Sequence, residues 1–289
     1  MTIGYIICAH TQPGQLVRLV RRLRGGGAHF YIHVDKRVPG SVMREVERDL
    51  GLDEDVRLLP RHRCYWASFS LVEAVLEGVE ALLADPVGVD YGVLLTGQDY
   101  PLRPAGVIER RLEEAGGRSF LSHWPSAGRF LARVEQWHFN GELGGRRVRV
   151  PNRLLPLRIG RTLPVGLEAF TGSAHWCLSR ESLELVAGLL NDRPEVGEFF
   201  RRSAVPDESF FQTILLSSPL APTIVNDDLR YIDWSGGGDS PRVLTVDDLG
   251  SMLESGDLFA RKFDPEVDAR VLDELDAAID ARAQPARLL

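Results

Sequence analysis

The stretch IGYIICAHTQPGQLVRLVRRL, residues 3–23, decides the fold of this chain. It begins with an apolar run, Ile3 to Ala9, which predicts a buried β-strand. A polar break follows, and beyond it apolar residues recur at the spacing of one helix face: Leu16, Leu19, Val20 and Leu23. Strand, loop and helix in this order predict the first unit of an α/β domain.

The same alternation continues outward from this stretch. Apolar runs predict further strands at Phe30 to Val34, Val56 to Leu59, Tyr91 to Leu95 and Ala169 to Leu178. Helical periodicity predicts helices around Val42 to Leu50, Ser68 to Leu83, Ser182 to Leu190, Asp207 to Ser217 and Asp264 to Arg282. The irregular middle, Ser122 to Leu167, predicts loops over the active face. Alternating strands and helices predict an α/β fold with a mixed, mostly parallel sheet flanked by helices.

Length and composition limit the class of protein. The chain has 289 residues, of which 44% are hydrophobic and 26% are charged, so it can bury a large core. Either one large α/β domain or two tightly joined halves fits this length. The net charge of −7 argues against a general affinity for nucleic acid or for an anionic membrane.

Three features of the sequence concern the cellular compartment. The first residues read directly as a strand, without a charged leader or a cleavage site. No run of about twenty apolar residues is present, so we expect no membrane-spanning helix. The cysteines are odd in number, widely spaced and set among apolar residues, which favours buried reduced thiols: Cys8, Cys64 and Cys177. Together these features predict a cytoplasmic protein.

Polar side chains follow the predicted strands. His10, Asp35 and Asp99 each come after an apolar run, at the sheet edge where ligands gather in such folds. The segment Gly97-Gln98-Asp99 offers one carboxylate, whereas hard divalent cations prefer several oxygen ligands. We therefore predict no metal at this edge. As an alternative, both aspartates are turn residues, and the spacing of the histidines favours structural roles: His10, His33, His62 and His175.

Basic residues near the end of the chain offer another way to bind negative charge. Arg242 follows a Ser-Pro pair, and Arg261-Lys262 stands between Phe259 and Phe263, which would anchor it. A guanidinium binds phosphate oxygens in pairs, and lysine adds a compact charge. These side chains therefore predict a diphosphate site without a metal. The alternative is an ordinary solvated charge pair.

Eight short motifs follow one another along nearly the whole chain: Val34-Asp35-Lys36-Arg37, Trp66-Ala67-Ser68, Leu95 to Leu102, Thr171-Gly172-Ser173-Ala174, Pro206 to Phe211, Leu229 to Trp234, Ser240-Pro241-Arg242 and Phe259 to Asp264. In kind and order they resemble those of glycosyltransferase family 14. This family contains the core-2/I-branching β-1,6-N-acetylglucosaminyltransferases and the peptide O-xylosyltransferases. Each motif is weak by itself, and the common order is what makes the resemblance specific.

The resemblance implies a single GT-A glycosyltransferase domain over residues 1–289. Its nucleotide-binding half would span about 1–105, and its acceptor and catalytic half about 106–289. It also implies an inverting, metal-independent enzyme that takes a UDP-sugar and a hydroxyl-bearing acceptor and needs no cofactor. Glu208 matches the general base, which by its residues alone is a carboxylate at a helix start.

The other matched residues divide between donor and acceptor. The resemblance implies that the following residues bind the UDP-sugar donor: His10, Asp35, Arg37, Trp66, Asp99, Arg242, Arg261 and Lys262. It implies that Arg133, Ser173 and Trp234 bind the acceptor. A buried core position fits Trp234 equally well. The arginine-rich segment Arg146 to Arg161 fits either an acidic acceptor or a solvated loop.

The sequence also departs from the family. Xylosyltransferases carry an acidic residue where this chain has Ala174, so the resemblance favours N-acetylglucosamine over xylose as the donor sugar. The membrane anchor, stem and disulfides of animal members have no counterpart, so we do not expect a Golgi-type glycoprotein acceptor.

Two other classes stay open beside this interpretation. One is a non-catalytic protein that binds sugar nucleotides or glycans. The other, a dinucleotide-dependent oxidoreductase, is disfavoured because His10 to Gly14 is not a Gly-x-Gly-x-x-Gly turn.

Overall fold

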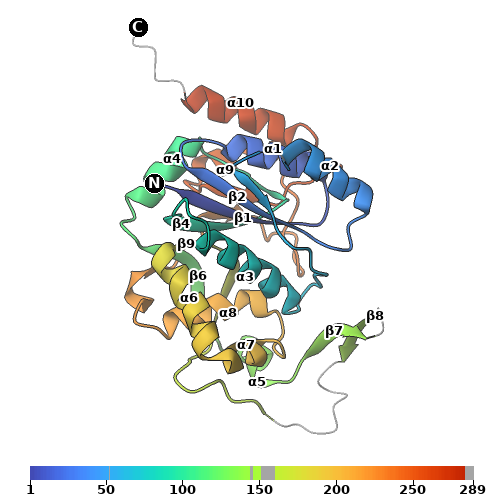
Figure 1. Ribbon diagram of the computed structural model, residues 1–289. Coiled ribbons are helices and arrows are strands. Elements are labelled where there is room, and N and C mark those ends of the chain that lie inside the picture. Colours follow the sequence, from blue (N-terminus) through green and yellow to red (C-terminus); the bar gives the residue numbers. More distant parts are fainter. Residues whose placement is uncertain (52, 144–145, 151–159, 284–289) are drawn as a thin grey trace.

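The computed structural model describes residues 1–51, 53–143, 146–150 and 160–283, with the backbone alone between 140 and 150 (Figure 1). Its main sheet has seven strands in the order β10-β6-β9-β4-β1-β2-β3. These strands are β1 (Ile3–Ala9), β2 (Ala28–Val34), β3 (Val56–Leu58), β4 (Tyr91–Thr96), β6 (Ser119–Pro125), β9 (Phe170–Ser179) and β10 (Ile224–Val225). β9 pairs antiparallel with β4 and β6, and the other pairs are parallel. The predicted mixed, mostly parallel sheet is confirmed, and both predicted halves contribute strands.

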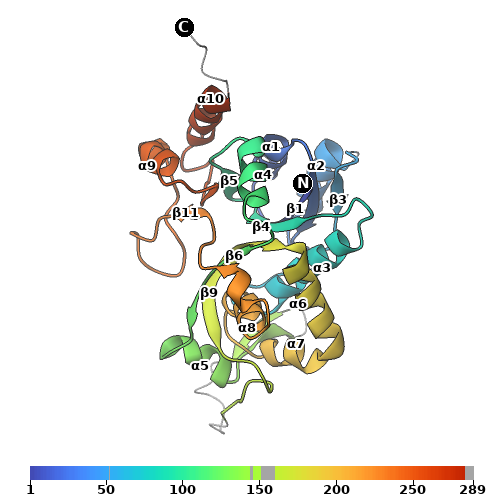
Figure 2. The ribbon, with the colours of Figure 1, turned by 90° about the vertical axis from the view of Figure 1, so that its left-hand side faces the viewer.

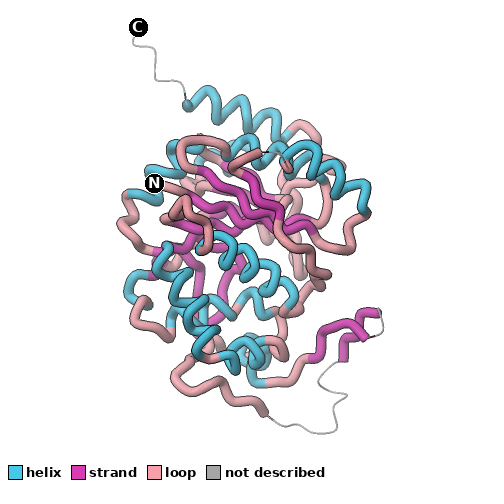
Figure 3. The backbone as a smooth tube through the Cα atoms, viewed as in Figure 1, coloured by secondary structure: helices cyan, strands magenta, loops and turns pink. Residues whose placement is uncertain are grey.

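Helices cover both faces of the sheet, as Figures 1 and 3 show. One face carries α1 (Pro13–Leu23), α2 (Gly40–Leu50), α4 (Ala105–Glu113), α9 (Leu249–Glu254) and α10 (Val271–Ala283). The other carries α3 (Ser70–Leu83), α6 (Arg180–Asp192), α7 (Pro194–Phe200) and α8 (Phe210–Leu216). Successive side chains of a strand point to opposite faces, so Tyr5 and Ile7 join the first core and Ile6 joins the second. None of the described helices is both long and apolar enough to cross a bilayer.

A second, smaller sheet carries the basic motif. In it β12 (Phe259–Arg261) lies between β11 (Arg230–Ile232) and β5 (Asp99–Pro101). The register places Arg261 opposite Asp99. Phe259 and Phe263 are completely buried, so their predicted anchoring role is confirmed. Because both anchors are fixed in the core, the basic pair between them has a defined position.

Three predicted elements need correction. The middle segment is not only loop: it contains the end of β6, α5 (Arg129–Glu135) and a hairpin of β7 (Phe139–Leu143) and β8 (Arg146–Val150). Of the arginine-rich segment, residues 151–159 lie outside the described part of the chain. The last helix begins at Val271 because the carboxylates of Asp264 and Asp268 bind backbone N–H groups of the preceding turns.

The third correction concerns the predicted helix from Asp207 to Ser217. A 3-10 turn, η2 (Pro206–Glu208), comes first, and α8 begins only at Phe210. Ser209 separates them, since its φ of −141° is not helical. Glu208 therefore ends a tight turn and does not start an α-helix.

A β-bulge interrupts β9 beside this turn. Leu121 of β6 pairs with Trp176 and His123 pairs with Gly172, so β9 advances further than β6 over the same length. At Gly172 the two strands approach so closely that a Cβ atom would overlap the Ser122 carbonyl oxygen. Such bulges are frequent beside active sites, because they redirect side chains.

We expect Gly172→Ala to lower the free energy of unfolding by about 2 kcal/mol or more, because two backbones must separate. Thermal unfolding would show the loss. Gly188→Ala on α6 is the matched control: no atom lies within 4 Å of its added Cβ, so stability should stay equal or rise. Equal melting temperatures for the Gly172 variant and the wild type would contradict the close approach.

Candidate functional site

Arg261 is held in the small sheet by a buried acid and a histidine. Its Nε lies 3.6 Å from the Asp99 carboxylate, and its Nη1 donates to the ring of His175. Burial, together with the charges of Arg261 and Arg230, keeps the pKa of His175 well below its ordinary value. A neutral ring can accept the hydrogen bond. Thr96 donates to the same Asp99 carboxylate from its backbone N–H at 2.7 Å, so the carboxylate is fixed too.

Lys262, the neighbour of Arg261, and Arg242 differ in whether carboxylates of the protein balance their positive charge. Lys262 Nζ donates to the hydroxyl of Ser240 at 2.6 Å, and no carboxylate of the described residues forms an ion pair with it. Arg242 is bound by two carboxylates, those of Asp233 and Asp248, each at 2.5 Å. Lys262 thus keeps its positive charge for a ligand, whereas the charge of Arg242 is balanced within the protein. The predicted diphosphate role of Arg242 stays a prediction.

His10 connects the strand ends of the main sheet with this basic group. Burial lowers the pKa of His10, and the charges of Arg37, Arg261 and Lys262 lower it further, against the opposite effect of Asp35. Charge effects of this kind fall off within about 10 Å at ordinary salt, so His10 lies within electrostatic reach of both groups. The structure therefore places His10 between Asp35 and Arg37 on one side and Arg261 and Lys262 on the other.

Arg37 lies next to Asp35 and packs on Tyr65, which Trp66 follows in the sequence. Arg37 binds the Asp35 carboxylate at 2.7 Å, and its guanidinium lies 5.1 Å from the centre of the Tyr65 ring. Burial raises the pKa of Asp35, but the hydrogen bonds from Arg37 outweigh this and lower it. Trp66, the next residue, is 47% exposed. The Tyr65 ring under an oriented guanidinium, followed in sequence by an exposed indole, suits a flat base.

Asp35 and Asp99 lie after β2 and β4, at the predicted strand ends. Both side chains are almost entirely buried, at 3% and 1% exposure. Their oxygens are already used, by Arg37 and by Thr96. They therefore orient Arg37 and the Thr96 backbone in this structure. A sequence does not show which strand-end side chains are covered, and the predicted donor-binding role of both residues stays a prediction.

Glu208 lies beside the first residues of β9. Its carboxylate binds Arg133 of α5 at 2.5 Å and is 34% exposed, so a substrate can reach it. Thr171 of β9 donates through Oγ1 to the Glu208 carbonyl at 2.9 Å, and Gln212 donates to the carbonyl of Ser173 at 2.6 Å. Arg133, predicted on the acceptor side, is therefore first of all the partner of the carboxylate.

Asp207 precedes Glu208 and differs from it in environment. Burial, and then the charge of Glu208, raise the pKa of Asp207 to about 7, although Arg133 and Arg261 oppose the rise. Its Oδ1 is buried and has no hydrogen-bond partner among the described groups. Because Arg261 acts on Asp207, the carboxylate end and the cationic end of the site lie within electrostatic reach of each other.

The raised pKa gives a test by pH. The folded state binds the Asp207 proton more tightly than the unfolded chain, whose value is near 3.8, so this residue reduces stability progressively from about pH 4 to pH 7. We expect Asp207→Asn to remove that reduction. The melting temperatures should be similar at pH 4, and the variant should be more stable at pH 8, by on the order of 2–4 kcal/mol. A constant difference across pH would contradict the assignment.

β9 links the two ends of the site. Thr171 contacts Glu208, and His175, four residues later, contacts Arg261. Even a fully extended strand would place these two contacts only about 13 Å apart, and the bulge between them shortens the path. Figure 2 shows β9 running from its place beside β4 to the neighbourhood of α5.

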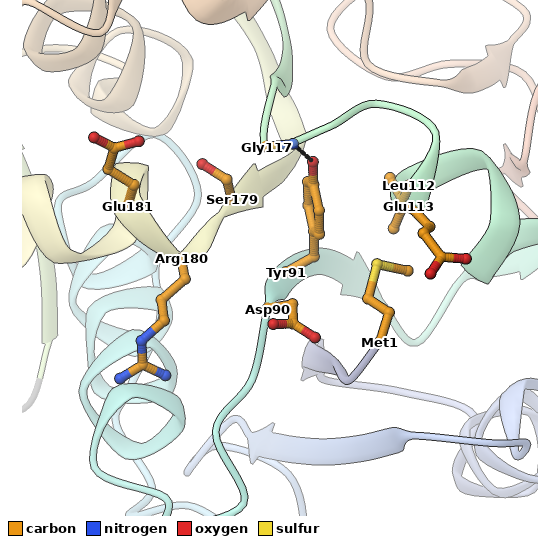
Figure 4. Close-up of a pocket in the computed structure, with 9 residues that line it drawn as sticks. All are labelled: Met1, Asp90, Tyr91, Leu112, Glu113, Gly117, Ser179, Arg180 and Glu181. Carbon is orange, nitrogen blue, oxygen red and sulfur yellow. Dashed lines mark hydrogen bonds between the residues drawn. The ribbon is translucent and has the colours of Figure 1, made fainter.

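A hollow of about 320 Å³ lies elsewhere, at the opposite end of the sheet. It is lined by Met1, Asp90, Tyr91, Leu112, Glu113, Gly117, Ser179, Arg180 and Glu181. Figure 4 shows Tyr91 at its centre, with the hydroxyl bonded to the Gly117 amide. Three carboxylates against one guanidinium make this lining unsuitable for a diphosphate.

The comparison of sequences decides the family. The profile of the core-2/I-branching enzyme family matches residues 3–253. The chain belongs to the core-2/I-branching enzyme family. This is a family of glycosyltransferases, and the resemblance seen in the motifs is confirmed.

Several known relatives of this chain are named xylosyltransferases. Xylosyltransferase 2 of Mus musculus is 29% identical over 300 residues, covering 95% of this chain and 33% of its own length. Xylosyltransferase 1 of Rattus norvegicus is 26% identical over 296 residues, covering 95% and 35%. The chain thus spans about a third of the length of these relatives.

Among solved structures, 4-diphosphocytidyl-2C-methyl-D-erythritol synthase from Anaerococcus prevotii aligns with a TM-score of 0.35 and 11% identity, covering 76% of this chain and 95% of that one.

The structure therefore brings together most, but not all, of the predicted site. Ser173 lies in the bulge of β9 between the two ends. Trp234 is 54% exposed, which excludes the core position, but no contact joins it to the Glu208 end among the described residues. The described residues contain no cluster of three or more histidines, cysteines or acids suited to a metal. The predicted catalytic and binding roles remain predictions.

Proposed function

We propose that this chain is an inverting glycosyltransferase that moves a sugar from a UDP-sugar to an acceptor hydroxyl without a metal. The observation that carries the proposal is the position of β9, which contacts the Glu208 turn through Thr171 and the cation Arg261 through His175. A carboxylate and a group of cations at the two ends of one short segment match the two needs of the reaction.

The chemistry follows from this arrangement. The Glu208 carboxylate takes the proton of the acceptor hydroxyl as its oxygen attacks the anomeric carbon. The bond from that carbon to the diphosphate oxygen breaks, and the diphosphate leaves with the electron pair. Arg261 and Lys262 stabilise the charge that develops on it, which is the task of a metal in other enzymes. One displacement inverts the configuration of the anomeric carbon.

Two donor sugars have support from different observations. Ala174 stands where xylosyltransferases have an acidic residue, and this favours N-acetylglucosamine. The names of the relatives favour xylose. Both donors therefore belong in the first experiment, with N-acetylglucosamine as our proposal.

Release of UDP tests the function directly. The purified chain is incubated with UDP-N-acetylglucosamine or UDP-xylose, with and without EDTA, and free UDP is measured. We expect release from at least one donor at an unchanged rate in EDTA. Loss of activity in EDTA, with recovery on addition of Mn²⁺, would contradict the metal-free mechanism.

The alternative is a protein that binds sugar nucleotides without catalysis. It predicts that UDP-sugars raise the melting temperature while no UDP is released with any donor. The partly exposed Glu208 carboxylate, in a turn that contacts the same strand as an oriented cation group, favours the enzyme.

A further inference from the structure

An exposed indole stands on β6, next to the part of β9 that contacts the Glu208 turn. Trp124, near the end of β6, is 43% exposed, which is unusual for so large an apolar side chain. It pairs directly with Thr171 of β9, the residue whose hydroxyl binds the Glu208 carbonyl. Directly opposite residues of antiparallel strands project to the same face, so the indole and the Glu208 turn share one face of the sheet.

Side chains give a second, independent link between the two. The rings of Trp124 and Phe130 meet edge to face with centroids 6.1 Å apart. The Arg133 guanidinium lies 4.8 Å from the Phe130 ring, and it binds Glu208 at 2.5 Å. Arg129 packs on the same ring at 4.9 Å. The indole is therefore held in place before any ligand arrives, which lowers the entropic cost of binding to it.

We propose that Trp124 forms an acceptor subsite, on which a sugar ring of a glycan acceptor stacks while its neighbouring hydroxyl reaches Glu208. This inference rests on the proposed function. An indole offers a flat apolar surface, and a pyranose offers an apolar face of C–H groups with hydroxyls at its rim. The exposed guanidinium of Arg129 beside the platform supplies donors for those hydroxyls.

The same region is poorly suited to an extended peptide. A peptide would add to the edge of β6 beyond Phe120, where pairing with β10 ends. There the N–H of His123 is already bound by the Asn226 side chain at 2.7 Å. Pro125, two residues on and facing the same way, has no N–H to offer. The edge thus lacks the backbone donors that strand addition needs, and this favours a glycan.

The test separates acceptor binding from donor chemistry. Transfer to p-nitrophenyl glycosides of galactose, glucose, N-acetylglucosamine, mannose and xylose is measured beside slow hydrolysis of the UDP-sugar without acceptor. We expect Trp124→Ala to raise the acceptor KM about tenfold or more. Acceptor-independent hydrolysis should not change. Trp124→Phe should recover most of the affinity, and Val107→Ala, an exposed apolar residue of α4, should have no effect.

Three results would overturn the subsite. One is an unchanged acceptor KM in Trp124→Ala. Another is an equal loss of hydrolysis, which would show a structural role. The third is hydrolysis by the wild type without transfer to any glycoside, which would exclude a sugar acceptor. Absence of hydrolysis and transfer alike in the wild type would instead overturn the proposed function.

Discussion

Glu208→Gln is expected to reduce turnover by roughly 10²- to 10⁴-fold, the usual contribution of a general base. The amide keeps the size of the side chain and its contact with Arg133 but cannot take a proton from the acceptor. Binding of UDP should stay within a few fold of wild type, because Arg261 contacts β9 at His175, four residues from the Thr171 contact of the Glu208 turn. Turnover is measured as UDP release with saturating donor and acceptor, and UDP binding by calorimetry.

The matched control is Glu135→Gln, an exposed carboxylate at the end of the same helix that carries Arg133. It removes an equal charge without touching the proposed base, so turnover should be preserved. Retained turnover in Glu208→Gln would refute the assigned base. An equal loss in both variants would point to a general effect of charge.

Lys262→Ala should have the second largest effect, a loss of UDP affinity of about 10- to 100-fold. A charge-assisted hydrogen bond to a charged group contributes about 1.5–3 kcal/mol. Lys262 is a cleaner target than Arg261, because its side chain makes one described hydrogen bond, to the Ser240 hydroxyl. Removing Arg261 would in addition leave the buried Asp99 carboxylate without its cation.

Two comparisons sharpen this prediction. Lys262→Arg keeps the charge and should recover part of the affinity, and Arg48→Ala removes a highly exposed charge from α2 and should change nothing. The difference between wild type and Lys262→Ala should shrink as salt is added, because ions screen the attraction. Wild-type affinity in Lys262→Ala would show that the diphosphate binds elsewhere.

Much of the fold could be predicted because its central elements are buried on a regular pattern. β1 has the predicted bounds, Ile3–Ala9, and α1 and α3 follow their apolar spacing. The prediction for the middle segment, Ser122 to Leu167, was wrong for a physical reason. α5 has seven residues, and only Val134 is buried, so its periodicity is too short to detect. Such elements depend on tertiary contacts.

The site was predicted in part, through motif order and not through geometry. Glu208, Arg261 and Lys262 stand in short motifs, and the structure places the Glu208 turn against Thr171 and Arg261 against His175 of the same strand. His175 was interpreted as a structural histidine, yet it orients Arg261, because the bulge in β9 brings it there. From the sequence, Asp207 was only the first residue of a predicted helix. Its buried oxygen without a hydrogen-bond partner could not be predicted, because no sequence pattern reveals such an atom.

A crystal structure of the chain with UDP, grown in EDTA, tests the central claim most directly. The account predicts the β-phosphate within ion-pair distance of Lys262 and Arg261, with no metal between them and with Glu208 facing the position of the sugar. UDP bound away from these side chains, or a diphosphate that contacts neither cation, would contradict it.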